Sequence, residues 1–271
     1  MPYPPRPLAF ILAPTDQGAL IVNRFDFHQT EAGVYGVGGT LLRTGSYDAL
    51  EAGQGAQLLN LRRQYHGDGV VALDCGANIG VFTLEWAKTM TGWGQVIAIE
   101  AQERVFYALA GNIALSNCFN ARAVHAAVTA ESGVMRIPVL NHTAPASFGS
   151  LELRPSAQAE AIGQAIDHSE AHTTIVRALS IDSLELQRLD LLKIDVERME
   201  LEVLAGAART IGRCLPVIIV ERLKTSAAEL DAVLASHGYR RYVFGLNIVA
   251  VHPSDGVATH VTSAQAPDAT A

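Results

Sequence analysis

Short apolar runs alternate with segments of helical period between residues 70 and 252. Val70–Asp74 is an unbroken buried-strand run, and in Val81–Met90 the apolar side chains recur three to four residues apart, as on one face of a helix. The same alternation predicts further strands at Gln95–Ile99, Ala121–Val128, Leu191–Val196 and Leu215–Glu221, and helices at Arg104–Leu115, Met199–Ile211 and Ser226–Gly238. Strands alternating with helices predict a mostly parallel, doubly wound α/β sheet.

The end of this segment changes its pattern. Two apolar strands, Arg240–Phe244 and Ile248–His252, flank the short turn Gly245–Asn247. Two strands around so short a turn predict an antiparallel hairpin. The sheet is therefore expected to finish with a C-terminal hairpin.

The flanking segments have other patterns. Residues 1–65 are rich in predicted strands (Leu8–Leu12, Ala19–Asn23, Gly33–Gly39) and end in a short helix, Gln54–Tyr65. We therefore expect a β-rich extension at 1–65, a main domain at 66–252 and a disordered tail at 253–271. Within the main domain, an insertion at about 133–180 is predicted to form a lid or a substrate-facing excursion.

Composition narrows the function classes. The chain has 271 residues, 49% of them hydrophobic, which excludes wholesale disorder. It carries 20 Lys and Arg against 27 Asp and Glu, without a basic block, so we expect no nucleic-acid partner. Three cysteines without a CxxC spacing, and no predicted signal peptide or membrane span, favour the cytoplasm. The oligomeric state is left open.

The segment Asp74–Gly80 is the most informative in the chain. It lies between a buried strand and a helix, where glycines allow close approach of a ligand. Glu100 ends the next strand, 20 residues after Gly80, which suits an acid that binds a ribose diol. A nicotinamide dinucleotide would fit Glu100, but it requires G-x-G-x-x-G and would be repelled by Asp74. S-adenosylmethionine (SAM), which is cationic and has no phosphate, fits the loop better.

Several motifs together resemble those of the FkbM-type SAM-dependent methyltransferases. They are Asp74–Thr83, Leu192–Glu200 followed by Leu204–Ala207, Pro216–Glu221, and the helix that ends at Gly238-Tyr239. The resemblance covers residues 70–245 and implies a class I methyltransferase fold, a Rossmann-like sheet of seven strands. It also implies O-methylation of hydroxyls on sugars, polyketides or similar small molecules.

The resemblance implies roles for the loop residues and shows two departures. Gly76, Asn78 and Gly80 would line the methionine part of SAM, with Asp74 close by, and Glu100 would hold the ribose. The family's Glu-Pro pair is Glu100-Ala101 here, and the family glycine after Asp-Val-Glu is Arg198. Arg198 also keeps a second hypothesis open, a catalytically weak or inactive binding module with a methyltransferase fold.

The predicted catalytic residues are three carboxylates, Asp195, Glu197 and Glu221, at the ends of two strands. They are expected in the same crevice as the glycine loop, where one of them can take the proton of an acceptor hydroxyl. Such a cluster can also bind a hard cation, but no motif requires it, so no metal is predicted. His142, His172 and Ser147–Ser150 of the insertion are weaker candidates for substrate contact. The acceptor is expected to be a small molecule or a glycan.

Overall fold

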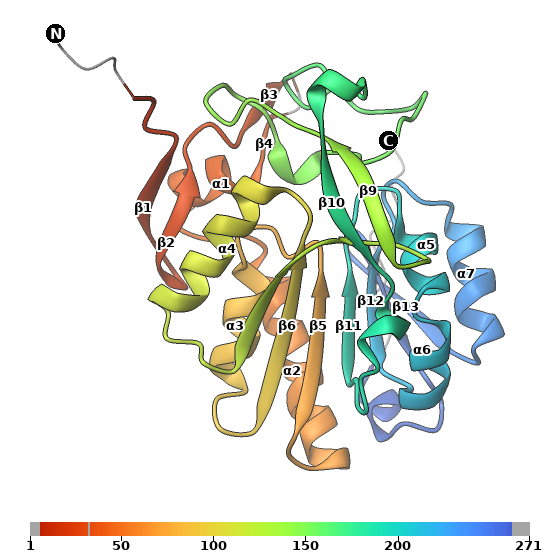
Figure 1. Ribbon diagram of the computed structural model, residues 1–271. Helices are drawn as coiled ribbons and strands as arrows, with labels where there is room; N and C mark the ends of the chain where they lie inside the picture. Colours follow the sequence, from red (N-terminus) through yellow and green to blue (C-terminus); the bar gives the residue numbers. More distant parts are fainter. Residues whose placement is uncertain (1–5, 32, 262–271) are drawn as a thin grey trace, which may run out of the picture.

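The computed structural model describes residues 6–31 and 33–261, and a seven-stranded sheet lies at its centre (Figure 1). The strand order is β13-β14-β12-β11-β5-β6-β7. Its strands are β5 (Val70–Cys75), β6 (Gly94–Glu100), β7 (Ala121–His125), β11 (Leu191–Ile194), β12 (Val217–Glu221), β13 (Arg240–Phe244) and β14 (Asn247–Val251). Only β14 runs against its neighbours. This is the class I methyltransferase arrangement, and it confirms the predicted fold class.

Helices cover both faces of the sheet. On one face lie α2 (Ala49–His66), α3 (Val81–Thr89) and α4 (Glu103–Leu115), and on the other α5 (Glu200–Ala205), α6 (Ala208–Cys214) and α7 (Ala227–Ser236). Alternate residues of β5 enter the two cores: Val70 and Ala72 the first, Val71 and Leu73 the second. Burial on both sides explains why this strand is an unbroken apolar run.

Two predicted elements are divided in the structure. The strand expected at Ala121–Val128 ends at His125, and β8 (Ala127–Val128) joins a separate sheet. The helix expected at Met199–Ile211 is divided into α5 and α6 at Gly206-Ala207. Gly206 packs against the backbone of Thr129, where a Cβ atom would lie 2.3 Å from the carbonyl oxygen. Hydrophobic periodicity does not reveal such contacts between distant segments.

The N-terminal region contains more helix than its sequence predicted. Strands β1 (Phe10–Thr15) and β2 (Gly18–Asn23) form one hairpin, and β3 (His28–Thr30) and β4 (Gly33–Tyr35) form another. The strand expected through Gly39 is wrong beyond Tyr35, since α1 occupies Val37–Thr44, and α2 begins five residues before the predicted Gln54. The glycines of these helices allow close packing: a Cβ on Gly55 would lie 2.5 Å from the Trp86 ring.

The insertion has its own small sheet. Strand β10 (Thr173–Leu179) pairs with β8 and with β9 (Gly133–Pro138). Between β9 and β10 the chain is mostly irregular, apart from the short 3-10 helices η1 (Phe148–Ser150) and η2 (Glu170–His172). Figure 1 places the insertion and the β3–β4 hairpin at the same end of the molecule.

The predicted disorder from Pro253 is wrong for residues 253–261. They include the 3-10 helix η4 (Gly256–Thr259), and the buried Asp255 forms an ion pair with Arg62 of α2. Residues 262–271 lie outside the described part. Among the described residues, no helix is long and apolar enough to cross a membrane. The three cysteines carry free thiols.

Candidate active site

A cavity of about 640 Å³ opens where β5, β6, β11 and β12 end. One side is formed by the loop after β5, the end of β6 and residues 126–128. Residues 147–150 of the insertion also belong to this side, since a Cβ atom on Gly149 would lie 2.8 Å from Asn78 Nδ2. The other side is formed by the loops after β11 and β12, by parts of residues 28–51 and by parts of residues 151–162. We call these the loop side and the acceptor side. The volume of the cavity lies within the range of small-molecule binding sites.

The loop side depends on a backbone contact at Gly76. This residue has a φ of +79°, and a Cβ atom placed on it would lie 1.8 Å from the carbonyl oxygen of Asp195. The amides of Gly76 and Ala77 donate to the carbonyl oxygen of Ile99 at 3.0 Å. The loop is therefore pressed between the ends of β6 and β11, and position 76 admits only glycine.

Glu100 and Asn78 line the loop side as predicted from the sequence. The Glu100 carboxylate accepts hydrogen bonds from the amides of Asn78 (3.1 Å) and Gln102 (2.8 Å). Burial raises the pKa of Glu100 to about 7 despite these bonds. Each carboxylate oxygen can accept more than one hydrogen bond, so Glu100 can still bind a diol from the cavity.

Asp74 and Gly80 do not line this cavity. Asp74 is fully buried beneath the loop, accepts a hydrogen bond from the Thr83 hydroxyl at 2.6 Å and lies 3.8 Å from Lys193 Nζ. Gly80 begins α3 with a φ of +95° and packs against Leu109. In this structure both residues support the loop from behind, where direct contact with a ligand was expected.

Lys193 connects the loop to the carboxylates of the acceptor side. The pairing of β11 with β5 sets Lys193 beside Asp74, and its buried ammonium group donates to Asp195 Oδ2 at 2.9 Å. The neighbouring carboxylates raise the pKa of Lys193 despite its burial. Lys193 therefore fixes the orientation of the Asp195 side chain.

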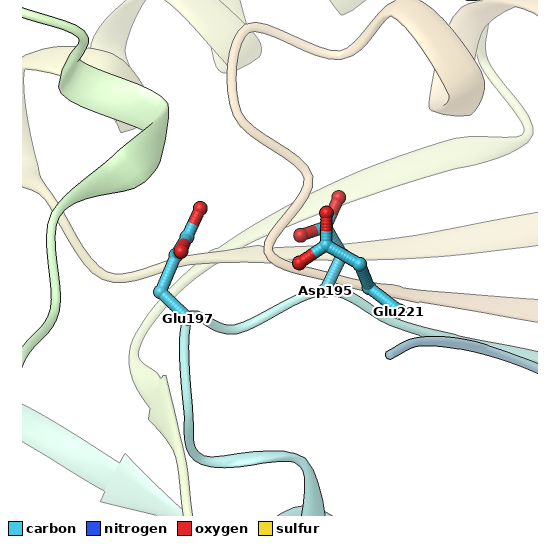
Figure 2. A group of neighbouring side chains, drawn as sticks. All are labelled: Asp195, Glu197 and Glu221. Carbon is cyan, nitrogen blue, oxygen red and sulfur yellow. The ribbon is translucent and has the colours of Figure 1, made fainter. Parts of the chain in front are cut away.

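The three predicted catalytic carboxylates lie together. Oxygen atoms of Asp195, Glu197 and Glu221 approach within 4.8 Å of one another, and Figure 2 shows the three side chains extending to the same side of the backbone. Burial is the main cause that raises the pKa of Glu197 to about 7 and of Glu221 to about 8, and repulsion from Asp195 adds to both shifts. This cluster can accept a proton near neutral pH or bind a cation.

The three carboxylates differ in their partners. Lys193 holds Asp195, and Lys224 donates to Glu197 at 2.6 Å. Within residues 6–31 and 33–261, no hydrogen bond or ion pair occupies the Glu221 carboxylate. Glu221 is therefore the carboxylate of the three that is most available to a ligand.

Sequence reasoning missed the contribution of the N-terminal region to the acceptor side. Tyr47, Asp48 and Glu51, around the start of α2, line the cavity. Tyr47 hydrogen-bonds to Asp48, Glu51 hydrogen-bonds to Asn247 of β14, and burial raises the pKa of all three groups. No motif marks these residues, since only folding brings them opposite β12.

The candidates in the insertion have different outcomes. Ser147, Gly149 and Ser150 line the cavity. The His142 and His172 side chains do not: the His142 ring packs on Phe148, and burial lowers its pKa to about 4, while His172 is exposed. A histidine base acting from a lid is therefore not supported.

A sequence model described as the methyltransferase FkbM domain matches residues 74–241. This chain belongs to the FkbM methyltransferase family. It is 24% identical over 192 residues to the methyltransferase sdnD of Sordaria araneosa, an alignment that covers 62% of this chain and 72% of the relative.

Solved structures with a similar chain path include the FkbM methyltransferase of Methylobacillus flagellatus KT, with a TM-score of 0.47 and 14% identity. That match covers 79% of this chain but only 60% of the other, which is less than two thirds of its length. Precorrin-6y C5,15-methyltransferase of Geobacter metallireducens GS-15 gives a TM-score of 0.40 at 13% identity, over 74% of this chain and 85% of the other. The family assignment rests on residues 74–241, since such scores are too low to support an argument.

Proposed function

We propose that this FkbM-family chain is a SAM-dependent O-methyltransferase that acts on a hydroxyl group of a small molecule or sugar. The observation that carries the proposal is that two groups of residues line opposite sides of the same cavity. Gly76, Asn78 and Glu100 lie on one side of it, and the Asp195, Glu197 and Glu221 carboxylates on the other. A nucleoside bound on the first side would lie next to carboxylates that can act as bases, which supports the proposal.

The residues of the loop side fit SAM. Glu100 offers carboxylate oxygens to a ribose diol, while Ile99 and residues 126–128 offer an apolar surface to a base. Asp195, which also lines the cavity, offers negative charge to the sulfonium and ammonium groups. Within the described lining, the lysines Lys193 and Lys224 are both paired with carboxylates. Neither ammonium group is therefore available to bind a pyrophosphate. This disfavours a dinucleotide.

When bound, SAM supplies a methyl group on a positively charged sulfur, which keeps the bonding electrons when the methyl group is transferred. The acceptor oxygen must lose its proton as it bonds to the methyl carbon, and Glu221 is the proposed base. A pKa of about 8 lets Glu221 take a proton near neutral pH. Asp195 and Glu197, held by their lysines, would orient the hydroxyl group.

The three carboxylates support a second version of this chemistry. Oxygen ligands within 4.8 Å of one another suit a divalent cation, which would lower the pKa of a bound hydroxyl group. Residues Asp195, Glu197 and Glu221 would hold the ion. Turnover that stops with EDTA and returns with Mg²⁺ would favour this version over proton transfer to Glu221 alone.

Arg198 motivated the alternative of an inactive binding module. Its side chain does not line the cavity and is paired with Glu152, so it neither crowds the cavity nor adds an unpaired cation to it. Turnover decides between the two hypotheses. We expect the protein to release S-adenosylhomocysteine from SAM with at least one hydroxylated acceptor from a panel of methyl glycosides, phenols and hydroxy acids. SAM binding without product across such a panel, with and without Mg²⁺, would favour the binding module.

A further inference from the structure

Residues 151–162, which we call the strap, cross the acceptor side of the cavity. Leu151 and Leu153 at one end and Ile162 at the other are buried. All three also line the cavity, together with Glu160 and Ala161. Between its ends the strap is mostly exposed and has no helix or strand, so polar contacts hold its middle in place.

Arg198 makes several of these contacts. Its Nε lies 2.8 Å from Glu152 Oε1, and its Nη2 donates to the carbonyl oxygen of Gln158 at 2.9 Å. Its Nη1 donates to the carbonyl oxygen of Lys224 at 3.2 Å, in the loop after β12. One guanidinium group thus joins the strap to the loops after β11 and β12.

The backbone at Arg198 is unfavourable for any residue except glycine. Its φ is +75°, and Glu197 before it has a φ of +55°. The family has glycine at position 198, which would adopt this conformation without strain. The contacts of the Arg198 side chain with the strap offer a physical reason for keeping arginine here.

Glu152 makes the arginine necessary. Its side chain is only 2% exposed and, among the described residues, neither carboxylate oxygen accepts a hydrogen bond. Arg198 is its ion-pair partner. Without this cation Glu152 would be a buried, uncompensated charge, and the strap would have to open to hydrate it.

Lys224 adds a second connection. Its Nζ lies 2.6 Å from Glu197 Oε2 inside the cavity and 3.4 Å from Glu160 Oε2 on the strap. Lys224 itself is held by the hydrogen bond from Arg198 to its carbonyl oxygen. The position of the strap is therefore linked to that of a carboxylate beside the proposed base.

We propose that Arg198 is a positioning residue that, with Lys224, holds the strap closed over the acceptor side and so sets the affinity for the acceptor. The proposal rests on the methyltransferase function proposed above. Closure excludes water and restricts the acceptor to orientations in which its hydroxyl group faces the carboxylates. Arg198 itself does not contact the cavity, so it acts through the strap.

Hydrogen exchange of the strap tests this without any ligand. We expect Arg198→Gly to speed exchange about tenfold at Gln158 and Ala159, whose amides donate hydrogen bonds within the strap. Arg198→Lys, which keeps a cation near Glu152, should restore part of the protection, and so should the double variant Arg198→Gly/Glu152→Leu. Arg209→Ala, which removes an exposed ion pair with Asp182, is the matched control and should leave the strap unchanged. Unchanged exchange in Arg198→Gly would overturn the proposal.

Kinetics test the positioning role itself, with the panel acceptor that the wild-type protein methylates. Arg198→Gly should raise the acceptor KM about tenfold and change kcat and the SAM Kd by less than about twofold. A fall in kcat with an unchanged KM would overturn the role. Wild-type protein that fails to bind SAM would remove the proposed function and leave the exchange result standing, so the two failures are distinguishable.

Discussion

The two sides of the cavity are built in different ways. On the loop side, the backbone of Gly76 touches the backbone of Asp195, and Glu100 accepts hydrogen bonds from backbone amides. On the acceptor side, charged side chains hold one another: Lys193 to Asp195, Lys224 to Glu197, and Arg198 to Glu152. Substitutions on the loop side should therefore lower cofactor affinity, whereas substitutions on the acceptor side should lower turnover.

The largest effect that separates the sides is expected from Glu221→Gln, which keeps the shape of the side chain and removes the proposed base. Turnover should fall by about 100- to 1000-fold, as expected for lost general-base catalysis. The SAM Kd should change by less than about twofold in calorimetric titration. Glu131→Gln, an exposed residue outside the cavity, is the control. Nearly full activity in Glu221→Gln would mean that another group takes the proton of the acceptor hydroxyl.

Gly76→Ala is expected to have the next largest effect, and on the other side. Its Cβ atom would lie 1.8 Å from the Asp195 carbonyl oxygen, so the loop must move. We expect SAM affinity to fall by about 100-fold or more and stability to fall by about 3 kcal/mol in urea titration. Gly53→Ala, in α2 with open space around it, should preserve both properties. Wild-type SAM affinity in Gly76→Ala would contradict the claim that the cofactor site requires the observed position of this loop.

Glu100→Ala should have a smaller effect, again confined to the loop side. Loss of a charge-assisted hydrogen bond to the ribose should weaken SAM binding by about 2 kcal/mol, or roughly 30-fold. Calorimetric titration measures this, with Glu131→Ala as the control. Unchanged affinity would show that the ribose binds elsewhere.

The smallest effect is a difference in pH dependence. Because the pKa of Glu221 is raised to about 8, the fraction of ionised base falls as the pH drops from 8 to 7, and kcat/KM should fall about fivefold. SAM affinity should fall by less than about twofold over that interval and weaken further below pH 7, because Glu100 has a pKa of about 7 and is mostly protonated there. Rates and Kd values at pH 6–9 check this. If kcat/KM and the SAM Kd had the same pH dependence, one titrating group would control both sides, which contradicts this prediction.

The sequence predicted the sheet well, and it predicted the position of the glycine loop beside the cavity, because both depend on local patterns. All seven strands of the sheet are present near their predicted positions, and Gly76, Asn78 and Glu100 line the cavity. The prediction failed where distant segments pack closely. The glycines that pack inside α1 and α2, such as Gly38 against Asn23 and Gly55 against Trp86, resemble turn signals in the sequence.

The acceptor side could be predicted only in part. Asp195, Glu197 and Glu221 lie at the carboxyl ends of two predicted strands, so their proximity was expected from the parallel sheet. Asp48 and Glu51 come from a region without a motif and reach the cavity because α2 packs beside β5 and β11. The contact of Arg198 with Glu152 joins residues 46 positions apart in an irregular segment, for which periodicity gives no signal.

The most direct test of the account is calorimetric titration of the wild-type protein with SAM, with S-adenosylhomocysteine and, separately, with NAD. We expect saturable 1:1 binding of both sulfur compounds, no binding of NAD, and a large loss of SAM affinity in Gly76→Ala. Binding of NAD, or no binding of either sulfur compound by correctly folded protein, would contradict it.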